Sequence, residues 1–192
     1  MLRWITITSI FFLLLGCAMA GSLAITPTVT IVATPTLEPS PTFTPAPPTE
    51  EPCGYAWANQ SLPEISANLS QAFADANLTG VLEARASAYG ENCVTASGQV
   101  QSFHAMYTDF YLTIAVEDTE DASVMGEWVE KVFPVLDRFP PGEVPGPNLG
   151  YVGIRFTGGG SEKNLWFRQQ TARDLLQQDK RGAALFEALG SP

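Results

Sequence analysis

A stretch rich in threonine and proline divides this chain and restricts what it can fold into. Residues 26–52 hold eight of the 15 prolines, together with eight threonines. Proline fixes φ and has no amide hydrogen, so such a segment forms neither a helix nor a central strand. We therefore expect residues 17–52 to be a disordered, extended linker, which would reach about 110 Å at full extension. Globular structure is expected only in residues 53–192.

The first residues have the layout of an export signal. Arg3 precedes an apolar run that begins at Trp4 and ends in the sequence Leu14-Leu15-Gly16-Cys17. These last four residues resemble the lipobox of bacterial lipoproteins. The resemblance implies a signal peptide over residues 1–16, transfer of diacylglycerol to the Cys17 sulfur, cleavage before Cys17, and acylation of the new N-terminus with a fatty acid such as palmitate. The protein would then be anchored in the lipid bilayer of the cell membrane, facing the extracytoplasmic side.

Two alternatives remain open for the same segment. Ala18-Met19-Ala20 also fits the small-residue pattern of ordinary signal cleavage, which would release a secreted protein. The apolar run from Trp4 to Ile25 is also long enough to stay uncleaved as a membrane anchor, which needs about 20 residues. All three interpretations place the folded part outside the cytoplasm. The resemblance is confined to the export signal, and we recognise no family for residues 53–192.

Residues 53–192 are expected to form one globular domain. This length is sufficient to bury a core. The whole chain has a net charge of −10, which argues against nucleic acid and anionic lipid surfaces as main partners. Cys53 and Cys93 are the cysteines of this part, and in an exported domain they predict one disulfide. Free or metal-bound thiols are the alternative, but the two lack the spaced His or Cys partners of a zinc site.

Hydrophobic periodicity predicts an α+β domain. Helices are expected after Leu62, after the capping candidates Asp118 and Thr119, and after Thr171. Pro134 should kink or end the second helix near Phe133. Alternating segments predict four strands, over residues 81–89, 103–116, 151–157 and 164–169. The element order α-β-β-α-β-β-α then predicts two layers, with the helices on one face of a single antiparallel sheet.

Such an arrangement leaves the other face of the sheet open, and alternation along the strands identifies its side chains. They are aromatic, arginine or acidic: Glu83, Arg85, Tyr89, Tyr107, Asp109, Tyr111, Tyr151, Arg155, Trp166 and Arg168. Tyr, Trp and Arg dominate the energetics of binding surfaces. We take five of these residues as the candidate binding site: Tyr107, Tyr111, Tyr151, Arg155 and Trp166. The alternative is that a loop, the proline-rich segment 139–150 or a second copy of the chain covers the face.

The sequence offers little for catalysis. His104 is the only histidine, and it is predicted on the core side at the start of a strand, where a structural role is expected. There is no Gly-x-Ser-x-Gly turn. The acidic cluster of Glu117, Asp118, Glu120 and Asp121 lacks the pattern of a calcium loop and fits a helix start. Gly158-Gly159-Gly160 fits a hairpin loop rather than a phosphate loop. We therefore expect no catalytic residue, no cofactor and no bound metal.

These observations favour a membrane-tethered binding module whose open aromatic and arginine face takes an unknown protein, peptide or glycan. The alternative from a different class is an envelope structural or assembly protein that forms a homodimer through the same face. An enzyme is the least favoured of the three classes, because His104 is its only distinctive candidate residue.

Overall fold

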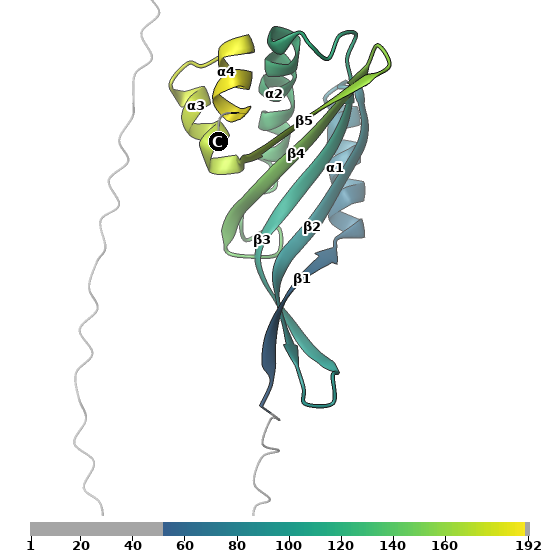
Figure 1. Ribbon diagram of the computed structural model, residues 1–192, viewed down its shortest axis with the longest axis vertical. Coiled ribbons are helices and arrows are strands. Elements are labelled where there is room, and N and C mark those ends of the chain that lie inside the picture. Colours follow the sequence, from purple (N-terminus) through teal and green to yellow (C-terminus); the bar gives the residue numbers. More distant parts are fainter. Residues whose placement is uncertain (1–51, 191–192) are drawn as a thin grey trace, which may run out of the picture. The chain divides into compact units, whose positions relative to one another are not determined.

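A five-stranded sheet organises residues 52–190, which are the part of the chain that the computed structural model describes. The strands lie side by side in chain order: β1 (Gly54–Ser61), β2 (Val81–Val94), β3 (Val100–Ala115), β4 (Asn148–Gly158) and β5 (Ser161–Arg168). Figure 1 shows this sheet in front of the helices. Three of the four pairings are antiparallel, whereas β3 and β4 run parallel. The sheet is therefore mixed.

Four helices accompany the sheet: α1 (Pro63–Asp75), α2 (Ala122–Leu136), α3 (Gln169–Gln177) and α4 (Gly182–Gly190). The predicted α+β class is confirmed. The predicted order is wrong in two places, because β1 precedes α1 and the last predicted helix is two helices. The backbone turns between them at Asp179 and Gly182, whose φ angles of 58° and 50° are left-handed and incompatible with a continuing helix.

The prediction of a purely antiparallel sheet is also wrong. Between β3 and β4 the chain passes through α2 and a long connection over residues 116–147. A connection of this length returns the chain to the end of the sheet where β3 began, so β4 can enter in the same direction as β3. In the observed register Leu112 lies beside Ile154, and Ile114 lies beside Phe156.

The start of α2 explains the acidic run that precedes it. Asp121 is the N-cap residue, and its Oδ1 accepts hydrogen bonds from the amides of Ser123 at 2.9 Å and Val124 at 3.2 Å. The predicted caps, Asp118 and Thr119, lie just before it. Of the two effects predicted for Pro134, a kink or an end near Phe133, the helix end does not occur. The helix continues past Pro134 to Leu136, and the burial of Val135 and Leu136 in the core holds this last turn.

The core lies between the helices and one face of the sheet. Its largest fully buried side chains come from β3, β4, α1, α2 and α4: Phe110, Phe156, Leu69, Ile114, Met125, Leu136, Ile154, Leu185, Val129, Val132 and Val152. Alternate residues of the strands point into this core. Gly126 in α2 packs so closely on Gly182 that a Cβ at position 126 would collide with the Gly182 carbonyl.

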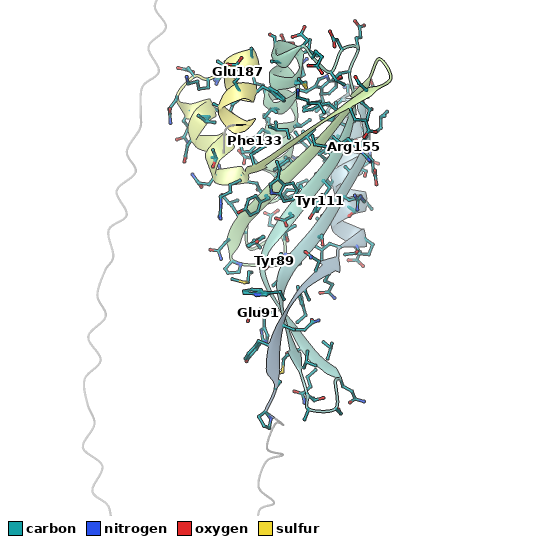
Figure 2. All side chains as sticks on the ribbon, in the orientation of Figure 1. Tyr89, Glu91, Tyr111, Phe133, Arg155 and Glu187 are labelled. Atoms are coloured by element: carbon teal, nitrogen blue, oxygen red, sulfur yellow. A yellow bond between two sulfur atoms is a disulfide. The ribbon has the colours of Figure 1, made fainter. Side chains whose placement is uncertain are left out.

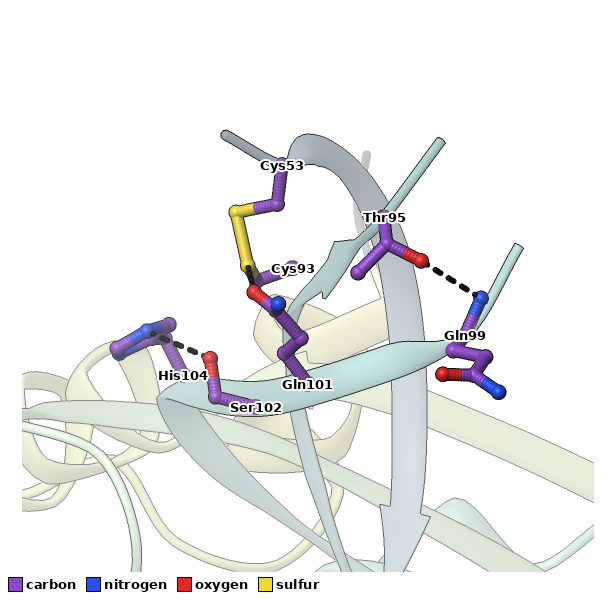
Figure 3. Close-up of a disulfide and its surroundings, with 7 residues drawn as sticks. All are labelled: Cys53, Cys93, Thr95, Gln99, Gln101, Ser102 and His104. Carbon is purple, nitrogen blue, oxygen red and sulfur yellow. Dashed lines mark hydrogen bonds between the residues drawn. A yellow bond between two sulfur atoms is a disulfide. The ribbon is translucent and has the colours of Figure 1, made fainter. Parts of the chain in front are cut away.

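Beyond the helical layer, β1 and the neighbouring ends of β2 and β3 continue as a narrow ribbon (Figure 1). Seven of the eight β1 residues are exposed, and none is buried. At the far end of this ribbon Cys53 and Cys93 form the predicted disulfide, with their Cα atoms 5.3 Å apart (Figure 3). The loop that it closes contains β1, α1 and most of β2.

The predicted signal peptide, the lipidated Cys17 and the linker up to residue 51 lie outside the described residues, as do residues 191 and 192. Within residues 52–190, no helix has the length and apolar character needed to cross a membrane.

Candidate binding face

Six aromatic side chains form a continuous row across the helix-free face of the sheet, which we call the aromatic strip. Every strand contributes at least one of them: Trp57 from β1, Tyr89 from β2, Tyr107 and Tyr111 from β3, Tyr151 from β4 and Trp166 from β5. Figure 2 labels two members, Tyr89 and Tyr111, on this side of the ribbon. The row therefore joins strands that are distant in the sequence.

Each ring of the strip contacts the next. Centroid distances are 5.5 Å for Trp57–Tyr89, 5.0 Å for Tyr89–Tyr107, 6.0 Å for Tyr107–Tyr151, 5.5 Å for Tyr151–Trp166 and 5.5 Å for Trp166–Tyr111. Three of these contacts are stacked, one is edge-on and one is tilted. Such pairs contribute about 0.5–1.5 kcal/mol each beyond the area that they bury. The rings therefore hold one another in place.

The strand registers explain how the strip assembles. Tyr89 of β2 lies directly opposite Tyr107 of β3, so their rings can stack across the pair. Trp166 of β5 lies opposite Gly153 of β4, and the indole occupies the space over this glycine. A Cβ atom at position 153 would collide with the indole ring. The glycine is thus what lets the ring lie close to the sheet.

The structure places all five candidate residues on this face, and four of them belong to the strip. The fifth, Arg155, lies near its β5 end. Two members of the strip were not among the five. Tyr89 was assigned to the face only, and Trp57 was missed because β1 was not predicted. The alternation of large and small residues in Tyr55-Ala56-Trp57-Ala58 was the signal that could have revealed this strand.

The strip is most open to solvent on the two edge strands, β1 and β5. Trp57 is 62% exposed and Trp166 is 49% exposed, and the four tyrosines of the strip are half-buried. The proline-rich connection does not cover it. The carbonyl of Pro145 accepts a hydrogen bond of 2.7 Å from the hydroxyl of Thr108, which points to the helix side of β3. The alternative in which segment 139–150 covers the face therefore does not hold for the strip.

Asp109 departs from the predicted open position. It lies in β3 between Tyr107 and Tyr111, yet only 5% of the residue is exposed. Its Oδ1 accepts a 2.7 Å hydrogen bond from the amide of Tyr151. Burial raises the pKa of the Asp109 carboxyl, and this hydrogen bond opposes the rise. Burial also raises the pKa values of the Tyr107 and Tyr111 phenols, with a further contribution from Asp109.

A charged cluster adjoins the β5 end of the strip. Arg85 Nε lies 2.9 Å from Glu83 Oε1, and Arg155 Nη2 lies 4.0 Å from Glu83 Oε2. The hydroxyl of Thr113 links Glu83 to Arg155, since it donates a hydrogen bond to Glu83 and accepts one from Arg155, each at 3.4 Å. The Arg85 guanidinium also sits 5.4 Å from the centre of the Tyr111 ring. Two arginines thus share one carboxylate.

These charged residues and the Trp166 indole surround a shallow hollow of about 300 Å³, which we call the Arg155 hollow. Gly153 and Asn164 also line it, and Asn164 of β5 lies opposite Arg155 of β4. The volume is at the lower end of the range for small-molecule sites. Arg155 is labelled in Figure 2 at this position on the sheet.

A further arginine, Arg168, flanks the middle of the strip. Its guanidinium lies 4.8 Å from the centre of the Tyr151 ring, a cation–π contact. It forms no ion pair with any residue between 52 and 190. The face therefore presents positive charge on a domain that is otherwise acidic.

His104 is not on the core side as predicted. It is exposed on β3, in the ribbon, with its Nε2 3.3 Å from the Ser102 hydroxyl (Figure 3). The helices do not extend along this part of β3, so neither face of the strand is buried there. No group of three or more His, Cys, Asp or Glu side chains among the described residues is arranged to hold a metal ion.

No family model, curated protein or solved structure matches this chain.

Proposed function

We propose that this protein is an extracytoplasmic binding module, held at the cell membrane by a lipid on Cys17, that captures its ligand on the aromatic strip. The single observation that carries the proposal is the strip itself, six rings in mutual contact on a face without helices. The resemblance of residues 14–17 to a lipobox supports the location. The proline-rich segment would act as the spacer between membrane and domain.

The physical argument is one of preorganisation. Each ring of the strip is already confined by its neighbours, so a ligand that packs on it orders few additional side chains. Tyr and Trp also offer a large apolar area together with a polar group, which suits contact surfaces. A surface with no partner would gain solubility from polar residues in these positions. We therefore expect the strip to be covered when the protein performs its function.

Charge supports a ligand on this face rather than elsewhere. Residues 53–192 contain 17 acidic and nine basic side chains, and three of the nine are Arg85, Arg155 and Arg168 on this one face. The remainder of the domain is strongly acidic and would repel anionic ligands. The arginines would direct such ligands to the strip.

An envelope assembly protein is the second candidate function. It is favoured by the edge strand β1, whose sequence Gly54-Tyr-Ala-Trp-Ala-Asn-Gln-Ser61 has no charge and no proline. Natural edge strands usually carry such features to prevent pairing between copies. A homodimer that uses this edge and the adjoining strip would bring no like charges together on β1.

The experiment is a binding screen of the full chain on glycan and peptide arrays, with variants of the face. Tyr111→Ala and Trp166→Ala should abolish capture, whereas Trp128→Ala, which removes an indole on the helix side, should leave it intact. Trp166→Ala should lower the free energy of unfolding by about 1–3 kcal/mol through its two ring contacts, in addition to the value of the indole area that is buried. A loss comparable with removal of a core phenylalanine would show that the strip is a structural core and would overturn the proposal. Sedimentation distinguishes the second candidate function from the first, because a chain that remains monomeric at high micromolar concentration excludes an assembly protein that forms homodimers.

A further inference from the structure

Most hydrogen-bonding capacity in the Arg155 hollow is unused. Within the described part of the chain, Nη2 is the one nitrogen of Arg155 with a partner, the Thr113 hydroxyl at 3.4 Å, and its nearest carboxylate oxygen is 4.0 Å away. Among residues 52–190, Nε and Nη1 of Arg155 and the side-chain amide of Asn164 form no hydrogen bond. A guanidinium has five N–H donors in a planar fork that matches a carboxylate. Nη2 has a second N–H group, which together with the N–H of Nε or of Nη1 leaves one complete edge of the fork for a bidentate ligand.

The charge balance points to an anionic ligand group. Arg85 and Arg155 together carry two positive charges, and Glu83 supplies one negative charge to both. The closer contact, at 2.9 Å, goes to Arg85. One net positive charge thus remains, and it is centred on Arg155, whose side chain is 47% exposed. A carboxylate on Arg155 would neutralise this charge.

The hydrogen-bond acceptors around the hollow call for a ligand that has donor groups as well as a carboxylate. Glu83 offers carboxylate oxygens, and Asn164 offers both a carbonyl oxygen and an amide. A ligand that carried only negative charge would be repelled by Glu83 and would leave Asn164 unsatisfied. Hydroxyl groups on the ligand would donate to Glu83 and exchange hydrogen bonds with Asn164. The indole of Trp166 adds an apolar wall, against which the C–H groups of a saturated ring can pack.

We infer that the Arg155 hollow binds an acidic sugar, a ring that carries both a carboxylate and hydroxyl groups. The inference rests on the proposed binding function and specifies its ligand class. The carboxylate lies in the fork of Arg155, the hydroxyls face Glu83 and Asn164, and the ring packs on Trp166. Further sugar units extend along the aromatic strip toward Tyr151.

The test uses calorimetric titration of the full chain with three matched probes. Tetragalacturonate carries carboxylates and hydroxyls, its full methyl ester keeps the hydroxyls and loses the charge, and tetraglutamate keeps the charge on a flexible chain without sugar rings. The inference expects binding of tetragalacturonate only. Affinity should also fall as the salt concentration rises, because the ionic contact is solvent-exposed.

Variants assign the binding to the hollow. Arg155→Gln should weaken binding of tetragalacturonate about ten- to a hundredfold, the usual effect of losing hydrogen bonds to a charged group. Arg155→Lys keeps the charge but loses the fork, so its affinity for tetragalacturonate should lie between those of the wild type and Arg155→Gln. Trp166→Ala should also weaken binding. Arg138→Gln, an equal change of charge on an exposed arginine at the end of α2, should have no effect.

The other outcomes are distinct. Equal binding of the methyl ester overturns the role of the carboxylate, and equal binding of tetraglutamate overturns the sugar class. Binding of tetragalacturonate that is unchanged in Arg155→Gln overturns the site. If no probe binds but strip variants abolish capture of another array ligand, the inference fails and the proposed function stands. If the arrays and the probes all give no binding, both fail.

Discussion

Removal of the Cys53–Cys93 disulfide is expected to destabilise the domain strongly. The perturbation is the double variant Cys53→Ala/Cys93→Ala, with Cys17 retained. In the folded state the two cysteines join the start of β1 to the end of β2, across a sequence separation of 40 residues. The bond restricts the unfolded chain much more than it restricts these strands, which are already paired by the β1–β2 ladder.

The loop length gives the magnitude. Closing a loop of this size removes chain entropy equivalent to about 4 kcal/mol at room temperature. This is an upper value, because β1 buries no side chain and can loosen in the folded state once the bond is absent. Domains are typically stable by only about 5–15 kcal/mol. For a domain of this length the loss corresponds to a melting temperature lower by about 10–15 °C.

The assay is denaturant unfolding followed by circular dichroism, with amide hydrogen exchange on β1. The double variant should unfold at lower denaturant, and its β1 amides should exchange faster than those of β4. Addition of a reductant should shift the wild type to the same midpoint and leave the variant unchanged. An unchanged midpoint in the variant would refute the reasoning, since it would mean that the bond does not restrict the unfolded ensemble.

Three other substitutions test separate features. Burial holds the pKa of Asp109 above its value in the unfolded chain, so the native state loses stability as pH rises from about 4 through the folded-state pKa. The Asp109→Asn variant should therefore have a higher melting temperature than wild type at pH 7 and lose this advantage below about pH 4. An equal difference in melting temperature at both pH values would contradict the raised pKa. Gly126→Ala should force α2 away from Gly182 and cost about 1–3 kcal/mol in denaturant unfolding, and wild-type stability would argue against the close helix contact. Gly153→Ala should displace the Trp166 indole and alter the near-ultraviolet circular dichroism. It should also cost about 1–3 kcal/mol of stability, which the lower backbone entropy of alanine relative to glycine partly offsets. An unaltered spectrum would show that the ring does not lie on the glycine.

Hydrophobic periodicity was sufficient for the elements that bury one face. The strands with Leu112, Ile154 and Phe167 and the helix with Val129 all show the alternation or spacing that burial requires. The disulfide followed from cysteine number and export context alone. These features depend on which side chains are apolar and on how many cysteines there are, and both can be read from a single sequence.

The errors concern elements or pairings that burial does not specify. Strand β1 buries no side chain, so no buried apolar pattern marked it. The parallel pairing of β3 and β4 depends on which end of the sheet the connection after α2 reaches, and residue patterns do not encode this. The division of the last helix occurs at Asp179, where the apolar stripe continues through a left-handed turn.

The candidate face was predictable in part for the same reason. Alternation assigned side chains such as Tyr111 and Trp166 to the face opposite the core. Which rings contact one another depends on register, which brings Tyr89 opposite Tyr107 and Trp166 opposite Gly153. The burial of Asp109 beneath its aromatic neighbours depends on the irregular pairing of β3 and β4 near Thr108. Sequence patterns therefore identified members of the surface but not its geometry.

The position of the disulfide has a mechanical consequence. Any tension applied through residues 1–51 enters the folded domain at Cys53, which is bonded both to the start of β1 and to Cys93. Part of the load therefore bypasses β1 and passes directly into β2, which is paired with β3 over most of its length. A force from the N-terminal side would thus act on β2 as well as on the short edge strand β1, so that detaching β1 alone would not relieve it.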